Sequence, residues 1–121
     1  MNTPTRIQRR RTKGWRKPDG AIYVGRGTAW GNPYAVVRMA DGRYSIPDPI
    51  DSLGTWATFD YERDARAEAV LLFRGWLAER PKLIERARRE LAGRDLMCWC
   101  PLDQPCHANV HLVVANGGEP A

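Results

Sequence analysis

The 121-residue sequence contains no apolar run that approaches the roughly 20 residues of a membrane-spanning helix. No apolar segment follows the charged N-terminus either, so a secretory signal is not expected. Cysteine is scarce: the chain has three, all between Cys98 and Cys106. So few and so crowded cysteines argue against a disulfide framework and favour a reducing compartment. We therefore expect a cytoplasmic protein that does not contact a membrane.

No internal repeat or low-complexity linker divides the chain, and its length fits one domain. Apolar residues make up 43% of it, which is enough for one modest core. We predict a basic N-terminal arm over residues 1–17, a single α/β domain over 18–116 and a disordered tail over 117–121.

Positive charge is concentrated at the N-terminus. Seven of the 19 Lys and Arg residues precede the first acidic residue, Asp19, which leaves 12 positive against 14 acidic residues in the rest of the chain. Such a segment gains affinity for phosphate groups by releasing counterions. Ile7 and Trp15 interleave the charges, which favours contact with a nucleotide or nucleic acid over a merely solvated terminus. The residues assigned to this contact are Arg9, Arg10, Arg11, Lys13, Arg16 and Lys17.

Local composition predicts four short strands and three helices. Residues 47–58 are expected to be irregular, because prolines and a glycine interrupt any period. The strands are expected over 21–24, 34–39, 43–46 and 96–100, with Asp41-Gly42 as the hairpin turn between the second and third. The helices are expected from the N-cap Asp60 to about Glu79, from Pro81 to Gly93, and from an N-cap at Asp103 or Gln104 to Ala115.

These elements indicate a small, three-layer-like α/β domain with a mixed, partly parallel sheet flanked by helices. Strands separated by helices are usually parallel neighbours, so we expect the strands at 22–24 and 96–100 to lie side by side. The loops that follow them would then meet at one edge of the sheet, where α/β proteins bind ligands. The sequence thus predicts a crevice between the loop at 25–33 and the segment at 98–107.

The first loop has the composition of a ligand cradle. Its glycines permit close backbone approach, Arg26 can clamp a phosphate, and Trp30 can stack on a base. The alternative is a tight turn with Trp30 packed in the core. The candidate ligand-binding residues are Gly25, Arg26, Thr28, Trp30, Gly31 and Asn32.

The second segment has the pattern C-x-C-x5-C-H and allows three interpretations. A thiol or imidazole active site at a helix N-terminus would use Cys106 and His107, with Asp103 as the nearest acid/base. A zinc site is possible with Cys100, Cys106 and His107, but adjacent helical residues point apart and the usual C-x2-C spacing is missing, so no metal is favoured. In the third interpretation Cys98 and Cys100 are small buried residues of a core strand.

Both loops resemble the family catalogued as domain of unknown function 4326, found in bacteriophages and actinobacteria. The matching segments are Tyr23-Val24-Gly25-Arg26, Trp30-Gly31-Asn32-Pro33-Tyr34, Cys98-Trp99-Cys100-Pro101-Leu102 and Pro105-Cys106-His107-Ala108. The stretch from Cys98 to Ala108 is also similar to a motif of domain of unknown function 488, in which a strand feeds a helix that begins with Cys-His. His111 does not belong to that motif, so it is left out of the candidate site.

We therefore expect a phage-type domain that binds or processes a nucleotide, nucleoside or nucleic acid in the crevice. If it is an enzyme, these candidate residues suit chemistry at a glycosidic or phosphate bond. The alternative is a non-catalytic, zinc-stabilised nucleic-acid-binding module that uses the basic arm. A third possibility is a phage protein that inhibits a host protein, acting in the host cytoplasm.

Overall fold

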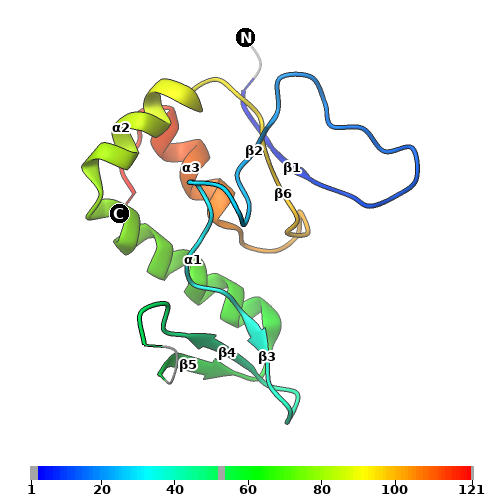
Figure 1. Cartoon of the computed structure of the whole chain (residues 1–121), viewed down its shortest axis with the longest axis vertical. Helices are drawn as coiled ribbons and strands as arrows, with labels where there is room; N and C mark the ends of the chain where they lie inside the picture. The colour runs from blue at the N-terminus through cyan, green and yellow to red at the C-terminus, as the bar shows by residue number, and fades with distance from the viewer. Residues whose placement is uncertain (1–2, 52–53, 121) are drawn as a thin grey trace.

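The computed structural model describes residues 3–51 and 54–120, which form two three-stranded sheets and three helices (Figure 1). The helices are α1 (Glu62–Ala78), α2 (Pro81–Glu90) and α3 (His107–Ala115). The strands of the first sheet are β1 (Arg6–Gln8), β2 (Ile22–Tyr23) and β6 (Leu96–Cys98). Those of the second are β3 (Val37–Arg38), β4 (Tyr44–Pro47) and β5 (Thr55–Phe59).

The first sheet is parallel and has the order β1-β6-β2. In the central strand, Leu96 pairs with Arg6 on one side and with Ile22 on the other. The predicted parallel pairing of the two loop-bearing strands is therefore confirmed. All three β6 residues are buried, which fits the continuous apolar run expected of a covered parallel strand.

The first strand lies inside the segment that the sequence assigned wholly to a basic arm. Arg6–Gln8 is an edge strand, and the Arg9 amide also donates to the Cys98 carbonyl at 2.7 Å, so the segment outside the sheet begins after Arg9. Figure 1 shows the connection from β1 to β2 as a long loop beside the parallel sheet.

The second sheet is antiparallel, and the hairpin predicted at Asp41-Gly42 joins β3 to β4. Gly42 has φ +88°, a conformation that favours glycine. The prediction that residues 47–58 are irregular is wrong at its end, because Thr55–Phe59 forms β5 and pairs with β4. Good strand formers and an available partner edge outweigh the nearby prolines.

The predicted α/β domain is confirmed, with the parallel and antiparallel strands in separate sheets. Helix α1 contacts β4 and β5 on one side and α2 and α3 on another, so it connects the two halves (Figure 1). Its N-cap is Tyr61 rather than Asp60, because the Asp60 carboxylate accepts a 2.9 Å hydrogen bond from Arg43. None of the described helices is long and apolar enough to cross a bilayer.

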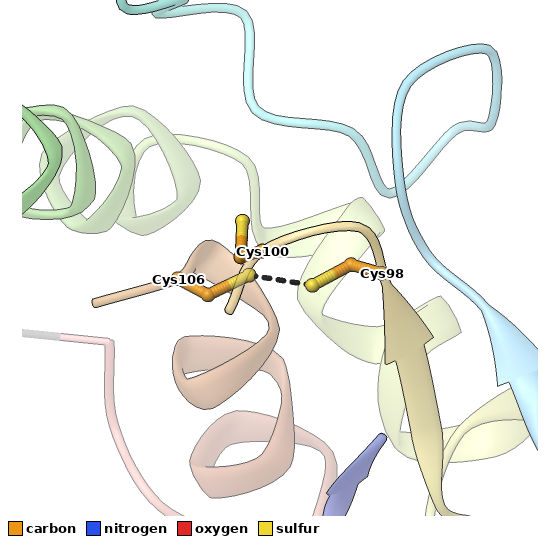
Figure 2. Close-up of side chains that lie close together, drawn as sticks. All are labelled: Cys98, Cys100 and Cys106. Carbon is orange, nitrogen blue, oxygen red and sulfur yellow. Dashed lines mark hydrogen bonds between the residues drawn. The ribbon is translucent and has the colours of Figure 1, made fainter. Parts of the chain in front are cut away.

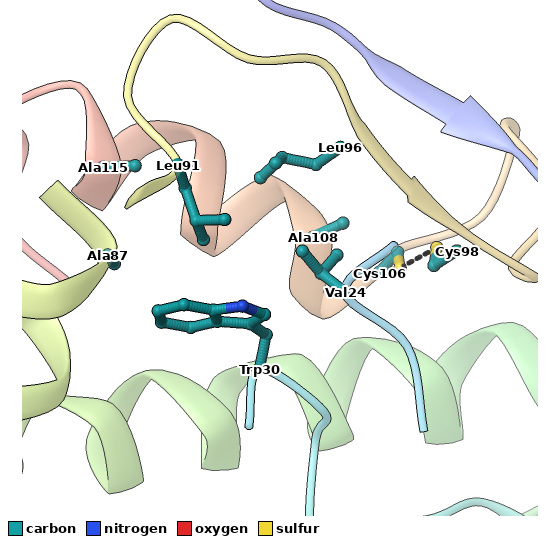
Figure 3. Packing of buried hydrophobic residues seen from close by; sticks show 9 residues of the cluster. All are labelled: Val24, Trp30, Ala87, Leu91, Leu96, Cys98, Cys106, Ala108 and Ala115. Atoms are coloured by element: carbon teal, nitrogen blue, oxygen red, sulfur yellow. Dashed lines mark hydrogen bonds between the residues drawn. The ribbon is translucent and has the colours of Figure 1, made fainter. Parts of the chain in front are cut away.

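The main core lies between the parallel sheet, α2 and α3, where Trp30 packs among aliphatic side chains (Figure 3). A second cluster, centred on Phe73 and Leu77 of α1, packs against α3. The segment expected to be a disordered tail packs along these helices as far as Pro120. The Gly118 amide donates to the Val113 carbonyl at 2.8 Å, and Pro120 is buried.

Candidate functional site

A cleft of about 390 Å³ opens at the carboxyl ends of β2 and β6. Gly25, Arg26 and Asn32 line it from the first loop, and the three cysteines and His107 line it from the second segment. The structure thus brings the two predicted loops together in one cleft. Parallel strands deliver both segments to this edge, as the sequence predicted.

Within the first loop, polar side chains hold the loop in shape. The Thr28 hydroxyl donates to the Gly25 carbonyl at 2.7 Å. The Asn32 amide donates to the Ala69 carbonyl of α1 at 3.0 Å and accepts from the Tyr34 amide at 2.9 Å. Thr28 and Asn32 therefore fix the position of the cleft wall, and Arg26 is left as the exposed, charged group of the loop.

Two glycines of this loop lie where a side chain would not fit. A Cβ at Gly25 would overlap the ring of Tyr23, and a Cβ at Gly31 would lie 3.1 Å from the Gly25 carbonyl oxygen. Close packing explains both glycines rather than positive φ: against the Tyr23 ring at Gly25 and against the backbone at Gly31. The turn therefore folds tightly back on the end of β2.

Trp30 does not offer the stacking face that the sequence suggested. It is only 6% exposed and lies in the core cluster (Figure 3). The ring of His111 meets it edge-on at 5.6 Å between centroids, and the His111 Nε2–H donates to the Trp30 carbonyl at 2.8 Å. The apolar ring is thus placed in the core, which agrees with the alternative interpretation of the loop.

Helix α3 begins later than the sequence predicted, with its N-cap three residues after Asp103 and two after Gln104. The N-cap is Cys106, whose backbone is extended at φ −148° and ψ 144°. Cys106 therefore does not follow the helical direction of His107, and its side chain turns back towards the end of β6 (Figure 2). The assumption that Cys106 and His107 point apart on a helix, which weighed against a metal, is wrong.

The three cysteines form a cluster at the cleft. Their Sγ atoms all lie within 4.8 Å of one another, and the Sγ atoms of Cys98 and Cys106 are 2.8 Å apart (Figure 2). Cys98 and Cys106 are buried, whereas Cys100 is partly exposed. Cys98 is thus not merely a small core residue, and this cluster of thiols is close enough to hold a metal ion.

The cluster favours a thiolate on Cys100. Hydrogen bonds from the Cys106 and Cys98 thiols lower the pKa of Cys100 to about 2, and the charge of Arg66 acts in the same direction. The same hydrogen bonds raise the pKa of Cys106, which stays protonated as a donor. Within the cluster the partly exposed Cys100 is therefore the thiol favoured as a thiolate, and Cys106 the one favoured as a donor.

His107 is held as a neutral imidazole. Its Nε2–H donates to the Val24 carbonyl at 2.7 Å, so Nδ1 carries the lone pair and lies 3.7 Å from the Cys106 Sγ. Burial lowers the pKa of His107, since an imidazolium would lose its hydration there. The ring therefore braces Cys106 and can accept a proton at Nδ1.

Asp103, the predicted acid/base, is exposed and does not line the cleft. The loop around it is held instead by Arg6 of β1. One Arg6 nitrogen lies 3.2, 2.9 and 2.8 Å from the carbonyl oxygens of Pro101, Leu102 and Gln104. These contacts fix the approach to α3 and direct Asp103 outwards.

Arg66 of α1 is a cleft residue that the sequence analysis missed. It lines the cleft with Ala69 and Val70, and its guanidinium forms a 2.7 Å ion pair with Glu62. The spacing of Arg66, Ala69 and Val70 places them on one helix face. The feature of the sequence that could have identified Arg66 is an arginine within a helix stripe that is otherwise apolar.

The basic segment forms a groove beside the cleft. Arg9 lies over the rings of Tyr23 and Trp99 at 4.9 Å each, and Arg11 lies over Trp99 at 4.8 Å. Arg10 and Lys17 also line this groove, while Lys13 and Arg16 are exposed outside it. Tyr23 and Trp99 line both the groove and the cleft, so the two adjoin at these two rings.

Comparison with known proteins gives one family match. The family model described as domain of unknown function (DUF4326) matches residues 7–117. No curated protein and no solved structure matches the chain. The matched range includes both walls of the cleft and the basic groove.

Proposed function

The chain belongs to the DUF4326 family, and we propose that it binds or processes a nucleotide, nucleoside or nucleic acid in the cleft between residues 25–33 and 98–107. The observation that carries this proposal is the set of groups around the cleft. Arg26 of the first loop and Arg66 of α1 supply two guanidinium groups, and Tyr23 and Trp99 supply two aromatic rings.

The charged groups suit a phosphate. Guanidinium groups bind phosphate oxygens through two parallel hydrogen bonds. The cleft also lies at the start of α3, where the positive end of the helix dipole favours an anion. These features support a ligand with at least one phosphate or similarly charged group.

The groove supports a nucleic acid as one form of that ligand. Arg9, Arg10 and Arg11 line it, and it adjoins the cleft at Tyr23 and Trp99. A basic track with aromatic rings is typical of surfaces that hold single-stranded nucleic acid. Processing at a glycosidic or phosphate bond would take place among Cys100, His107 and the arginines.

Equilibrium binding tests the proposal. Fluorescence anisotropy should show that fluorescein-labelled single-stranded oligonucleotides, or labelled mononucleotides, bind the wild-type chain. Arg26→Ala and Arg66→Ala should each weaken binding about tenfold or more, because a hydrogen bond to a charged group contributes about 1.5–3 kcal/mol.

Arg74→Ala is the matched control, since Arg74 is an exposed arginine of α1 that does not line the cleft. It should bind like the wild type. Equal affinity in all four proteins, or no binding by the wild type, would contradict the proposal.

The second candidate is a non-catalytic nucleic-acid-binding module stabilised by zinc, and the cluster of three thiols favours it. Deleting the N-terminal segment is a poor test, because it removes β1 from the sheet. Arg9→Gln with Arg11→Gln keeps the strand and removes two groove charges. If this double variant loses all oligonucleotide binding while Arg26→Ala does not, the module is the better description.

The three thiols also indicate the cellular compartment in which the protein acts. Three free cysteines in one cluster suit a reducing compartment, so we propose that the protein acts in the cytoplasm.

A further inference from the structure

The thiol cluster combines features that neither a core packing role nor the binding of a phosphate requires. Cys98 ends β6, Cys100 follows two residues later, and Cys106 caps α3, so three separate backbone positions bring sulfur to one point (Figure 2). All three are free thiols. Soft sulfur ligands gathered in this way select zinc among the common divalent ions.

The spacing of the sulfurs fits a tetrahedral ion. Ligands at about 2.3 Å around a tetrahedral zinc are about 3.8 Å apart. The Sγ atoms of Cys98 and Cys106 are 2.8 Å apart, and all three sulfurs lie within 4.8 Å of one another. The separation around a zinc ion thus lies between that of the closest pair and the upper limit for the cluster.

We propose that Cys98, Cys100 and Cys106 hold one zinc ion whose fourth coordination position opens into the cleft. His107 is not part of the mutually close group: its Nδ1 lies 3.7 Å from the Cys106 Sγ, and its Nε2–H is bound to the Val24 carbonyl. It is a positioning residue that braces Cys106. Zinc with three protein ligands and one open position is the arrangement of catalytic rather than structural sites.

The three cysteines line the same cleft as Arg26 and Arg66, so an open position on the ion would face these arginines. An anionic oxygen held by these arginines would be the fourth ligand, and the ion would polarise it as a Lewis acid. This last step rests on the proposed function of the cleft. The ion and its three ligands do not depend on it.

Metal content tests the ligand set. The wild-type chain, loaded with zinc and passed through a desalting column, should retain about one zinc per chain by native mass spectrometry and elemental analysis. Cys98→Ser, Cys100→Ser and Cys106→Ser should each lower zinc affinity at least tenfold in a competition with a chromophoric chelator, and His107→Asn should retain the ion. Retention of zinc by all three serine variants, or none in the wild type, would overturn the site.

Because Cys98 and Cys106 are buried, a serine variant can fail to fold. Thiol footprinting of the wild type avoids this difficulty. Cys100 is the partly exposed thiol, so zinc should slow its alkylation by iodoacetamide, and a chelator should restore it. Unchanged alkylation of Cys100 would remove it from the ligand set.

The cobalt-substituted chain tests the open position. Its visible d–d spectrum should change when imidazole is added, because imidazole enters a vacant position on the ion, and His107→Asn should leave the starting spectrum unchanged. If the spectrum does not change on addition of imidazole but differs in His107→Asn, His107 is the fourth ligand and the open position is overturned. If the cobalt-substituted chain shows the expected spectrum but binds no oligonucleotide, the result counts against the function proposed for the cleft and not against the metal site.

Discussion

Acidification should destabilise the protein through His111. This histidine is fully buried, and its Nε2–H donates to the Trp30 carbonyl, while its Nδ1 has no hydrogen-bond partner among the described residues. Burial therefore favours the neutral ring and lowers the pKa of His111 from 6.5 to about 4. In the unfolded chain the same ring is hydrated and protonates at its ordinary pKa.

The sign and size of the change in stability follow from this difference between the folded and unfolded pKa of His111. Protons bind the unfolded chain first, so the stabilising effect of the neutral histidine is complete above the unfolded pKa and is lost as the pH falls towards the folded one. Each pKa unit corresponds to about 1.4 kcal/mol, which sets an upper limit of about 3 kcal/mol for His111. Between about pH 8 and about pH 5 the expected loss is about 2 kcal/mol.

Urea unfolding of the wild type and His111→Gln over this pH range measures the effect. Glutamine keeps a donor for the Trp30 carbonyl but does not titrate, and all other groups contribute similarly to both chains. The wild type should therefore lose about 2 kcal/mol more than the variant on acidification. Equal losses in the two chains would refute the assignment of this pH dependence to His111.

Three further perturbations test other parts of the structure. Trp30→Ala should lower the free energy of unfolding by about 3–5 kcal/mol in urea titrations, because it leaves a cavity in the main core. A loss below about 1 kcal/mol would show that the indole is not packed there. Arg6→Met should cost about 1.5–3 kcal/mol by thermal or urea unfolding, since it removes the donor to the 101–104 carbonyls. Full stability of this variant would show that the loop does not depend on Arg6. Gly25→Ala should displace the Tyr23 ring and weaken oligonucleotide binding, whereas Gly75→Ala, at a helix position with open space, should not; identical affinities would contradict the close packing described for the loop.

The positions of the two loops could be predicted from the sequence, but much of their chemistry could not. The run from Leu96 to Cys98 and the segment before Gly25 both have the composition of buried strands, and helices separate them, so parallel pairing followed. The start of α3 was misplaced because Asp103 is a good N-cap in isolation. Three carbonyl contacts from Arg6, about 95 residues away in sequence, stabilise the loop in another conformation.

Long-range packing also explains the other differences. The local sequence of a glycine-rich loop does not distinguish an exposed tryptophan from a buried one. Trp30 is buried because residues of α2 and α3 form a pocket for it. Arg66 looks like a surface residue of an amphipathic helix until the helix is placed against the cleft. Cys98 joined the thiol cluster because the N-cap geometry of Cys106 directs it back to β6.

The order β1-β6-β2 has a consequence for the way the chain folds. The middle strand of this sheet is the last to be synthesised, so β1 and β2 have no partner between them until Leu96–Cys98 emerges from the ribosome. Contacts between residues so distant in sequence slow folding. The antiparallel hairpin and α1 form from local contacts and can be in place earlier. The cleft should therefore be the last part of the molecule to become structured, and a nascent chain that stops before β6 would have no ligand site.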